Sequence, residues 1–127
     1  MGAKRALLLP VSAPFHCSLM QPAAERLRAR LAEIEFQAPS IAVINNIDVA
    51  APTDSAAIRD ALYRQAFGPV RCVECIAALR ARGATHVVEC GPGKVLTGMV
   101  KRIDPHLHSA AIFDPASLAE TRTALGV

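Results

Sequence analysis

His16 is the residue whose type and position most favour catalysis. It follows the short apolar run Leu7–Val11, which predicts a buried strand, and lies in the loop-like segment 12–17. In α/β folds, functional groups gather in the loops that follow such strands. A histidine that acts as a general base needs a nucleophile and an acceptor for its Nδ1 proton. No serine of the chain lies in a G-x-S-x-G pattern, so a structural histidine remains the alternative.

Cys72 and Cys75 form a C-x-x-C that places two thiols on one face of a predicted helix. A zinc site would need two more ligands, and the nearby His86 and Cys90 match no familiar spacing. A redox pair would lie at a helix N-terminus after a strand, and Cys72 is near such a helix start, after Pro69. We expect two free, buried thiols and no metal site.

The segment Gly91-Pro92-Gly93-Lys94 joins a predicted strand to a predicted helix. Backbone N–H groups at a helix N-terminus can hold an anion. The spacing matches neither the Walker loop nor the G-x-G-x-x-G fingerprint. A tight strand-to-helix turn is therefore the simpler interpretation, and an anion-binding module is the alternative.

The composition restricts the class of protein. The 127 residues are 52% hydrophobic with a net charge of +3, which predicts one folded domain rather than disorder. Basic residues are scattered and aromatic residues are few, which disfavours a nucleic-acid binder. No apolar run reaches the roughly 18 residues of a membrane helix, and Pro10 interrupts the N-terminal run too early for a signal peptide. We expect a cytoplasmic protein with reduced cysteines.

Helices and strands are expected to alternate along the chain. Apolar spacings of three and four, with capping and stop signals, predict five helices, at about 19–32, 55–66, 73–82, 94–103 and 117–125. Continuous apolar runs predict strands at 7–11, 41–44, 85–90 and 109–113. This alternation is typical of an α/β sheet that is mainly parallel.

Five longer stretches together resemble the malonyl-CoA:acyl carrier protein transacylase family. They occur in the family's order and spacing: VSAPFHCSLM (11–20), VINNIDV (43–49), IRDALYRQ (58–65), GPVR (68–71) and ECGPGKVLTG (89–98). The chain departs from the family's pattern at Phe67, where Tyr is frequent, and at Cys72, where an aromatic residue is usual.

The resemblance implies a partial α/β-hydrolase-like acyltransferase core with a mainly parallel sheet, from which the family's inserted ferredoxin-like subdomain is absent. Residues 1–127 would be the C-terminal segment of a domain more than twice as long. The family's Gly-Gln-Gly-Ser loop and its Gly-His-Ser-Leu-Gly elbow with the nucleophilic serine do not occur in this sequence. We therefore expect the start, Met1–Arg5, to lie inside a longer reading frame.

The resemblance also implies roles for three residues. His16 is the general acid/base that takes the serine proton and later returns one to the leaving thiol. Gln65 offers its backbone carbonyl to the His16 Nδ1–H, at an expected distance of roughly 2.7–3.2 Å. Phe15 matches the malonyl-selecting form of the motif, because a bulky ring there crowds an α-methyl branch on the acyl group.

The implied activity is transfer of a malonyl group from coenzyme A to acyl carrier protein in fatty acid biosynthesis, through a Ser–His acyl-enzyme mechanism without metal or cofactor. Polyketide synthesis shares this chemistry and remains open. The implied partners are malonyl-CoA, acyl carrier protein and the N-terminal half of the enzyme, with no nucleic acid or membrane. The acidic carrier would dock on basic residues, for which the candidates are Lys4, Arg5, Lys101 and Arg102. The alternative is a non-catalytic truncated fragment or interaction module.

Overall fold

The computed structural model describes residues 2, 6–8 and 11–127. It forms two compact units. The first unit comprises Met1–Val43 with Pro52–Val70, and the second comprises Ile44–Ala51 with Arg71–Val127. In the described ranges, no helix is both long enough and apolar enough to cross a bilayer.

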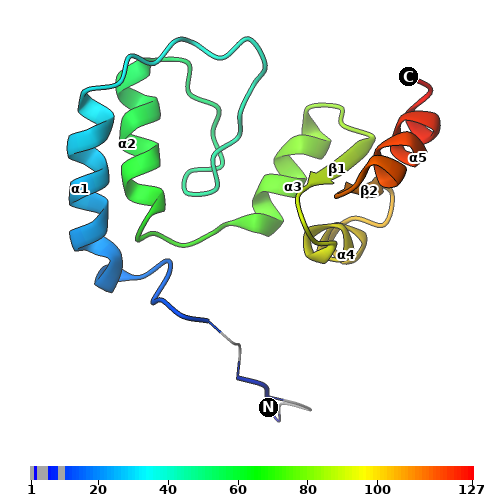
Figure 1. Cartoon of the computed structure of the whole chain (residues 1–127), viewed down its shortest axis with the longest axis horizontal. Helices are drawn as coiled ribbons and strands as arrows, with labels where there is room; N and C mark the ends of the chain where they lie inside the picture. The colour runs from blue at the N-terminus through cyan, green and yellow to red at the C-terminus, as the bar shows by residue number, and fades with distance from the viewer. Residues whose placement is uncertain (1, 3–5, 9–10) are drawn as a thin grey trace. The chain divides into compact units, whose positions relative to one another are not determined.

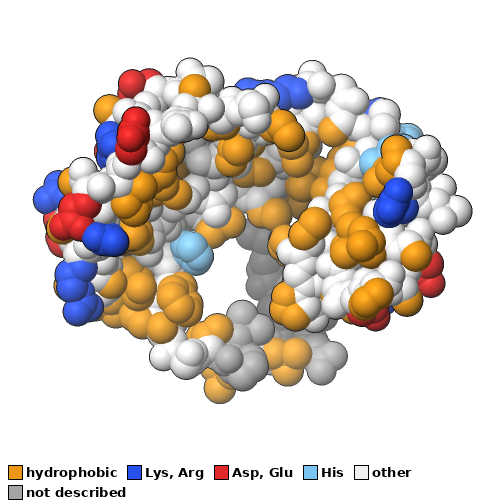
Figure 2. All heavy atoms as spheres, turned by 45° about the horizontal axis from the view of Figure 1, so that its top comes forward, with side chains coloured by type: hydrophobic (Ala, Val, Ile, Leu, Met, Phe, Trp, Pro, Cys, Tyr) orange, Lys and Arg blue, Asp and Glu red, His pale blue; other side chains and the backbone are white. Residues whose placement is uncertain are grey.

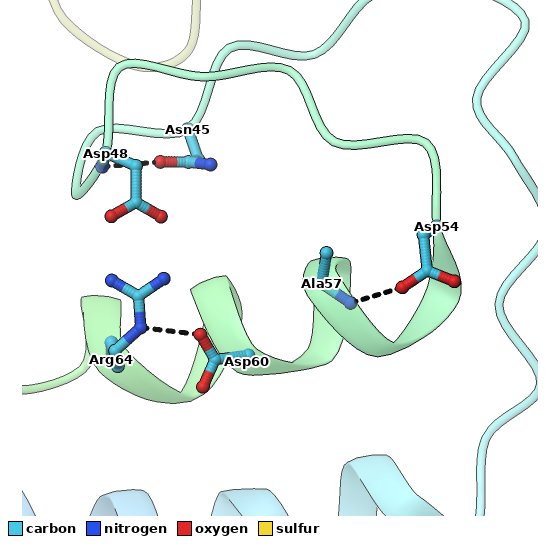
Figure 3. Close-up of polar contacts among 6 residues, drawn as sticks. All are labelled: Asn45, Asp48, Asp54, Ala57, Asp60 and Arg64. Atoms are coloured by element: carbon cyan, nitrogen blue, oxygen red, sulfur yellow. Dashed lines mark hydrogen bonds and ion pairs between the residues drawn. The ribbon is translucent and has the colours of Figure 1, made fainter.

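The first unit contains two helices side by side, α1 (Gln21–Ala32) and α2 (Ser55–Gln65), preceded by the 3₁₀ turn η1 (Ser18–Met20) (Figure 1). Pro22 lies in the first turn of α1, where a missing N–H costs little. Asp54 caps α2, because its carboxylate accepts a backbone N–H of the first turn at 2.9 Å (Figure 3). The structure therefore confirms both helices, which were predicted from these local signals.

The helices α1 and α2 meet along a short apolar seam. Ala24 and Leu31 of α1 and Ala61 of α2 are buried there. Arg59 of α2 donates to the carbonyl of Leu31 at 3.1 Å and to that of Ile34 at 2.7 Å. These carbonyls lie at and just beyond the C-terminal end of α1, where the helix itself supplies no donor. Arg59 therefore joins the C-terminal end of α1 to the side of α2 through these hydrogen bonds.

The second unit is a two-stranded parallel sheet with three helices (Figure 1). Its elements are α3 (Cys72–Ala81), β1 (His86–Cys90), α4 (Val95–Ile103), β2 (His108–Ile112) and α5 (Pro115–Leu125). In the strand register His86 is opposite His108 and Cys90 is opposite Ile112. Parallel strands need a crossover connection, and α4 provides it. The mixed α/β class with parallel pairing is confirmed.

A small apolar core holds the second unit together. Ile76 of α3, Val100 of α4 and Leu107 before β2 are buried against one another. Three partly buried side chains pack around them: Leu79, Val87 and Ile103. Helix α5 contacts β2, and its first turn is closed by a capping box in which Asp114 and Ser117 exchange hydrogen bonds.

Two predicted strands are wrong. The run Leu7–Val11 has no regular structure at residues 7, 8 and 11, and residues 9 and 10 lie outside the described part of the chain. The run Ile41–Ile44 forms no strand either, and Ile41 is 79% exposed. An apolar run becomes a strand only where a neighbour pairs with its backbone N–H and C=O groups. In the described residues, only β1 and β2 pair in this way.

Large apolar side chains are exposed in both units, as Figure 2 shows for the face in view. Leu8 is 101% exposed, Ile41 79% and Val95 73%. Monomeric proteins rarely leave more than a few hundred Å² of contiguous apolar surface in water. Exposed apolar side chains of this kind favour association with other protein.

We expect the isolated chain to bind a dye that fluoresces on apolar surface and to self-associate during size-exclusion chromatography. Replacing Ile41 and Val43, which are 79% and 62% exposed, with serine should lower the dye signal because exposed apolar area is removed. The matched control replaces the exposed polar residues Glu35 and Gln37 with serine and should change nothing. A sharp monomer peak without dye signal from the unsubstituted chain would contradict this expectation.

Candidate functional site

His16 adopts a left-handed backbone conformation just before η1. Its φ is 62°, a value that costs a non-glycine residue of the order of 1–2 kcal/mol. Two local hydrogen bonds hold the turn: Phe15 N–H donates to the Ala13 carbonyl at 2.9 Å, and the Cys17 thiol donates to the Pro14 carbonyl at 3.2 Å. Strained conformations of this kind gather at functional sites, where surrounding contacts maintain them.

One such contact joins His16 to the end of α2. The Nδ1 atom of His16 lies 3.3 Å from the backbone carbonyl oxygen of Gln65. A carbonyl only accepts, so Nδ1 is the donor, and in the neutral imidazole this is the tautomer whose lone pair lies on Nε2. The structure therefore brings together the two atoms that the family resemblance pairs, at a distance slightly longer than expected. The catalytic roles of the two residues remain predictions.

The sequence itself makes the Gln65 carbonyl available to an outside donor. Gln65 is the last residue of α2. In a continuing helix its carbonyl would accept from the backbone of residue 69, but Pro69 has no N–H. The proline thus directs this carbonyl out of the helical hydrogen-bond pattern.

Phe15 is 62% exposed, and its ring centroid lies 6.4 Å from that of His16, with the planes tilted by 46°. The aromatic ring therefore stands beside the imidazole without covering it. The selective role predicted for Phe15 remains a prediction.

A polar cluster near Gln65 was not foreseen from the sequence. The Tyr63 hydroxyl donates to Glu25 Oε1 at 2.6 Å, and this hydrogen bond raises the pKa of Tyr63. Arg28 pairs with the same carboxylate at 2.5 Å and lies over the Tyr63 ring at 5.0 Å. The cluster joins α1 to α2 two residues before Gln65. Glu25 and Arg28 are three residues apart in α1, but Tyr63 is 38 residues from Glu25, so no local spacing could reveal its place in the cluster.

Glu89 belongs to β1, and its carboxylate lies at the N-terminal end of α4. Its Oε2 accepts the backbone N–H of Thr97 at 2.8 Å and the Thr97 hydroxyl at 2.8 Å. The backbone N–H of Thr97 is the main reason why the pKa of Glu89 is lowered, and the hydroxyl and the N–H groups of Leu96 and Val95 add to it. A carboxylate of the chain itself therefore fills the place of an external anion. This argues against the anion-binding module considered for Gly91-Pro92-Gly93.

The C-x-x-C differs in part from its prediction. Cys72 and Cys75 are free, as expected, but both are half-buried rather than buried. Val73 in the same helix is 58% exposed, because the first turn of α3 presents only one side to the core. Cys75 Sγ donates to the Asn45 carbonyl at 3.6 Å, and burial raises the pKa of Cys75.

No group of three His, Cys, Asp or Glu side chains in residues 2, 6–8 and 11–127 gathers closely enough to hold a metal ion. His86 and His108 stack with ring centroids 4.9 Å apart and line a cavity of about 670 Å³ in the second unit. None of the three predicted site residues lines this cavity.

No protein-family model matches the chain. A curated relative from Salmonella typhimurium, a malonyl CoA-acyl carrier protein transacylase, is 52% identical over 122 residues, which is 96% of this chain and 40% of the relative. The relative of the same name from Bacillus subtilis is 43% identical over 117 residues, or 92% of this chain and 37% of the relative.

Solved structures of malonyltransferases are similar to this chain as well. The acyl-carrier-protein S-malonyltransferase of Burkholderia pseudomallei is 61% identical with a TM-score of 0.90, over 96% of this chain and 40% of that one. A malonyl-transacylase in complex with a type II PKS acyl-carrier protein is 47% identical with a TM-score of 0.92, over 97% of this chain and 40% of that one. The resemblance carried by the motifs is confirmed, and the chain spans about 40% of the length of these relatives.

Glu89→Gln should weaken folding in a pH-dependent way. A carboxyl group whose pKa is lowered in the folded state stabilises that state above its unfolded pKa, about 4.3 for Glu, and loses this contribution as the pH falls through the folded value. We expect the variant to unfold at lower urea concentration at pH 7, with the difference shrinking below about pH 4. Glu120→Gln, on the exposed side of α5, is the control and should show no such trend. If the urea concentration at half-unfolding changes with pH in parallel for the unsubstituted protein and both variants, the lowered pKa of Glu89 makes no contribution to folding.

Proposed function

We propose that residues 1–127 are the C-terminal segment of a malonyl-CoA:acyl carrier protein transacylase domain. The complete domain transfers a malonyl group from coenzyme A to acyl carrier protein in fatty acid biosynthesis. The similarity to transacylases over nearly the whole chain supports this proposal. The observation that carries it is the contact between His16 Nδ1 and the Gln65 carbonyl at 3.3 Å.

In the proposed mechanism, a serine from the upstream part of the domain attacks the thioester carbonyl of malonyl-CoA. His16 Nε2 takes the serine proton and gives it to the departing coenzyme A thiol. The carrier protein thiol then attacks the malonyl-serine ester, and His16 transfers the thiol proton back to the serine oxygen. The net change exchanges one thioester for another and needs neither metal nor cofactor.

The Gln65 carbonyl orients the base in this mechanism. Because it accepts from Nδ1, it favours the neutral tautomer that carries its proton on Nδ1, and it fixes the direction in which the Nε2 lone pair of that tautomer points. A neutral carbonyl stabilises the imidazolium less than a carboxylate does.

The proposed partners are malonyl-CoA, acyl carrier protein and the upstream part of the enzyme. Lys101 and Arg102 are exposed in the last turn of α4 and offer positive charge to an acidic carrier. Lys4 and Arg5, the other basic candidates, lie outside the described residues. The proposed location is the cytoplasm.

A second proposal is that the 127-residue chain acts as a non-catalytic fragment or interaction module. Two observations favour it. The sequence contains no Gly-His-Ser-Leu-Gly elbow, so it holds no serine of the expected kind. Apolar side chains such as Leu8 and Ile41 are exposed and available for contact with other protein.

A chimera in which this chain replaces the matching part of the Salmonella typhimurium relative tests both proposals. We expect the chimera to transfer malonyl groups to acyl carrier protein and the isolated chain to show no turnover. His16→Ala in the chimera should lower kcat by at least about 10³-fold, because removing one member of a catalytic Ser–His unit disables the whole unit. His106→Ala, at an exposed loop histidine, is the matched control and should leave kcat unchanged.

A folded chimera that stays inactive would contradict the transferase proposal and favour the interaction module. A His16→Ala chimera as active as the His106→Ala control would remove His16 from the mechanism. Circular dichroism of each variant establishes that folding is retained.

Phe15→Ser in the same chimera tests acyl selection. Removing the ring opens space for an α-methyl branch beside the imidazole. A methyl group in a binding pocket is worth about 1–3 kcal/mol, so the ratio of kcat/KM for methylmalonyl-CoA to that for malonyl-CoA should rise about tenfold or more. Phe113→Ser, at an exposed phenylalanine of the second unit, is the control. An unchanged ratio would exclude a selective role for Phe15.

A further inference from the structure

We propose that Cys72 and Cys75 form a reversible thiol–disulfide site at the start of α3, which a small disulfide such as oxidised glutathione converts into an intramolecular disulfide. The site goes beyond the proposed acyl transfer and uses none of its residues. The pair is reduced in the structure, where both cysteines are free.

The position of the pair in the helix makes closure feasible. Cys72 is the first residue of α3, and Cys75 follows one turn later on the same side. Side chains at this spacing have Cβ atoms about 5–6 Å apart in a helix, whereas a disulfide needs about 3.5–4.5 Å. The turn must therefore tighten.

The first turn of a helix can tighten at little cost, because its N–H groups have few intrahelical partners. The Cys75 N–H donates to the Arg71 carbonyl at 3.0 Å, which is the first bond of the helix. A change to 3₁₀ geometry moves this bond to the Cys72 carbonyl and shortens the distance between the two side chains. In the middle of a helix, the same change would break bonds on both sides.

The two thiols differ in their surroundings. Cys75 Sγ donates to the Asn45 carbonyl at 3.6 Å, and burial, followed by the charge of Cys72, raises the pKa of Cys75. A thiol held in this way is the slower nucleophile. Cys72 at the helix end is therefore the attacking thiol, and Cys75 is the thiol that completes the disulfide.

The chemistry balances with one molecule of oxidised glutathione. Cys72, after losing its proton, attacks one glutathione sulfur, so the glutathione S–S bond breaks and one glutathione thiol leaves. Cys75 then loses its proton and attacks the Cys72 sulfur of the mixed disulfide, which releases the second glutathione thiol. Two protein thiols are oxidised to one disulfide, and one glutathione disulfide is reduced to two thiols.

Oxidation would change the surroundings of residues 44–51. This segment is joined to α3 by the Cys75 thiol and by the Arg71 N–H, which donates to the Asn46 carbonyl at 2.9 Å. A disulfide removes the thiol donor and leaves the backbone bond. Asn45 also shapes the segment itself, since its Oδ1 accepts the Asp48 N–H at 2.7 Å (Figure 3).

Mass spectrometry of the full 127-residue chain tests the proposal. The reduced protein is equilibrated with mixtures of reduced and oxidised glutathione, quenched with acid, alkylated and digested with trypsin. Cleavage after Arg71 and Arg80 releases one peptide that contains both Cys72 and Cys75, while Cys17 and Cys90 fall in two other peptides. We expect this peptide to become two hydrogens lighter and to resist alkylation, while the peptides with Cys17 and Cys90 take up alkyl groups or glutathione.

As the share of oxidised glutathione rises, the fraction of folded protein that carries this disulfide should rise with it. Among single variants, Cys75→Ser should trap glutathione on Cys72 several-fold faster than Cys72→Ser traps it on Cys75. Cys90→Ser is the matched control and should keep the disulfide. The proposal is overturned by full alkylation of both cysteines at every glutathione mixture, by a peptide that links Cys72 to Cys90, or by faster trapping on Cys75.

Discussion

The candidate site depends on one backbone atom, the carbonyl oxygen of Gln65 at the end of α2. It accepts from His16 Nδ1 at 3.3 Å and so determines which imidazole nitrogen carries the proton. A backbone carbonyl reaches this position only if the helix ends at this residue. Pro69, four residues further on, has no N–H to donate, and this sequence feature directs the carbonyl toward an outside donor. The position of the helix end, rather than the identity of the Gln65 side chain, supplies the acceptor.

The position of that carbonyl depends in turn on how α1 and α2 are joined. Arg59 donates to two carbonyls at the end of α1, and Tyr63 donates to Glu25 at 2.6 Å. Both side chains project from α2, and both partners belong to α1 or its end. Since the buried seam consists largely of small side chains, apolar contact alone leaves the helices free to slide. The polar contacts set their register, and with it the distance between His16 and Gln65.

Local signals could predict most helices of this fold, but not all of its strands. The side chain of Asp54 caps the start of α2, while Pro22 in α1 and Gly83 with a φ of 90° after α3 act through their own backbone. All three act on residues next to them in the chain, so their effect is visible in the sequence. The run Ile41–Ile44 has the apolar composition of a buried strand, but no neighbouring strand pairs with it, and it forms no strand. The His16–Gln65 contact was anticipated from family resemblance, whereas the Tyr63–Glu25 contact joins residues without any shared local pattern.

At three helix ends of this chain, backbone groups of the terminal turn determine what a neighbouring side chain can do. At the C-terminal end of α2, an acceptor outside the helical pattern orients an imidazole. At the N-terminal end of α4, the carboxylate of Glu89 accepts N–H groups that would otherwise attract an external anion. At the N-terminal end of α3, the scarcity of intrahelical bonds allows the turn to tighten around two cysteines. The three ends share one physical cause, because backbone groups of a terminal turn have no partner within the helix. They differ only in the side chain that the sequence places beside that turn.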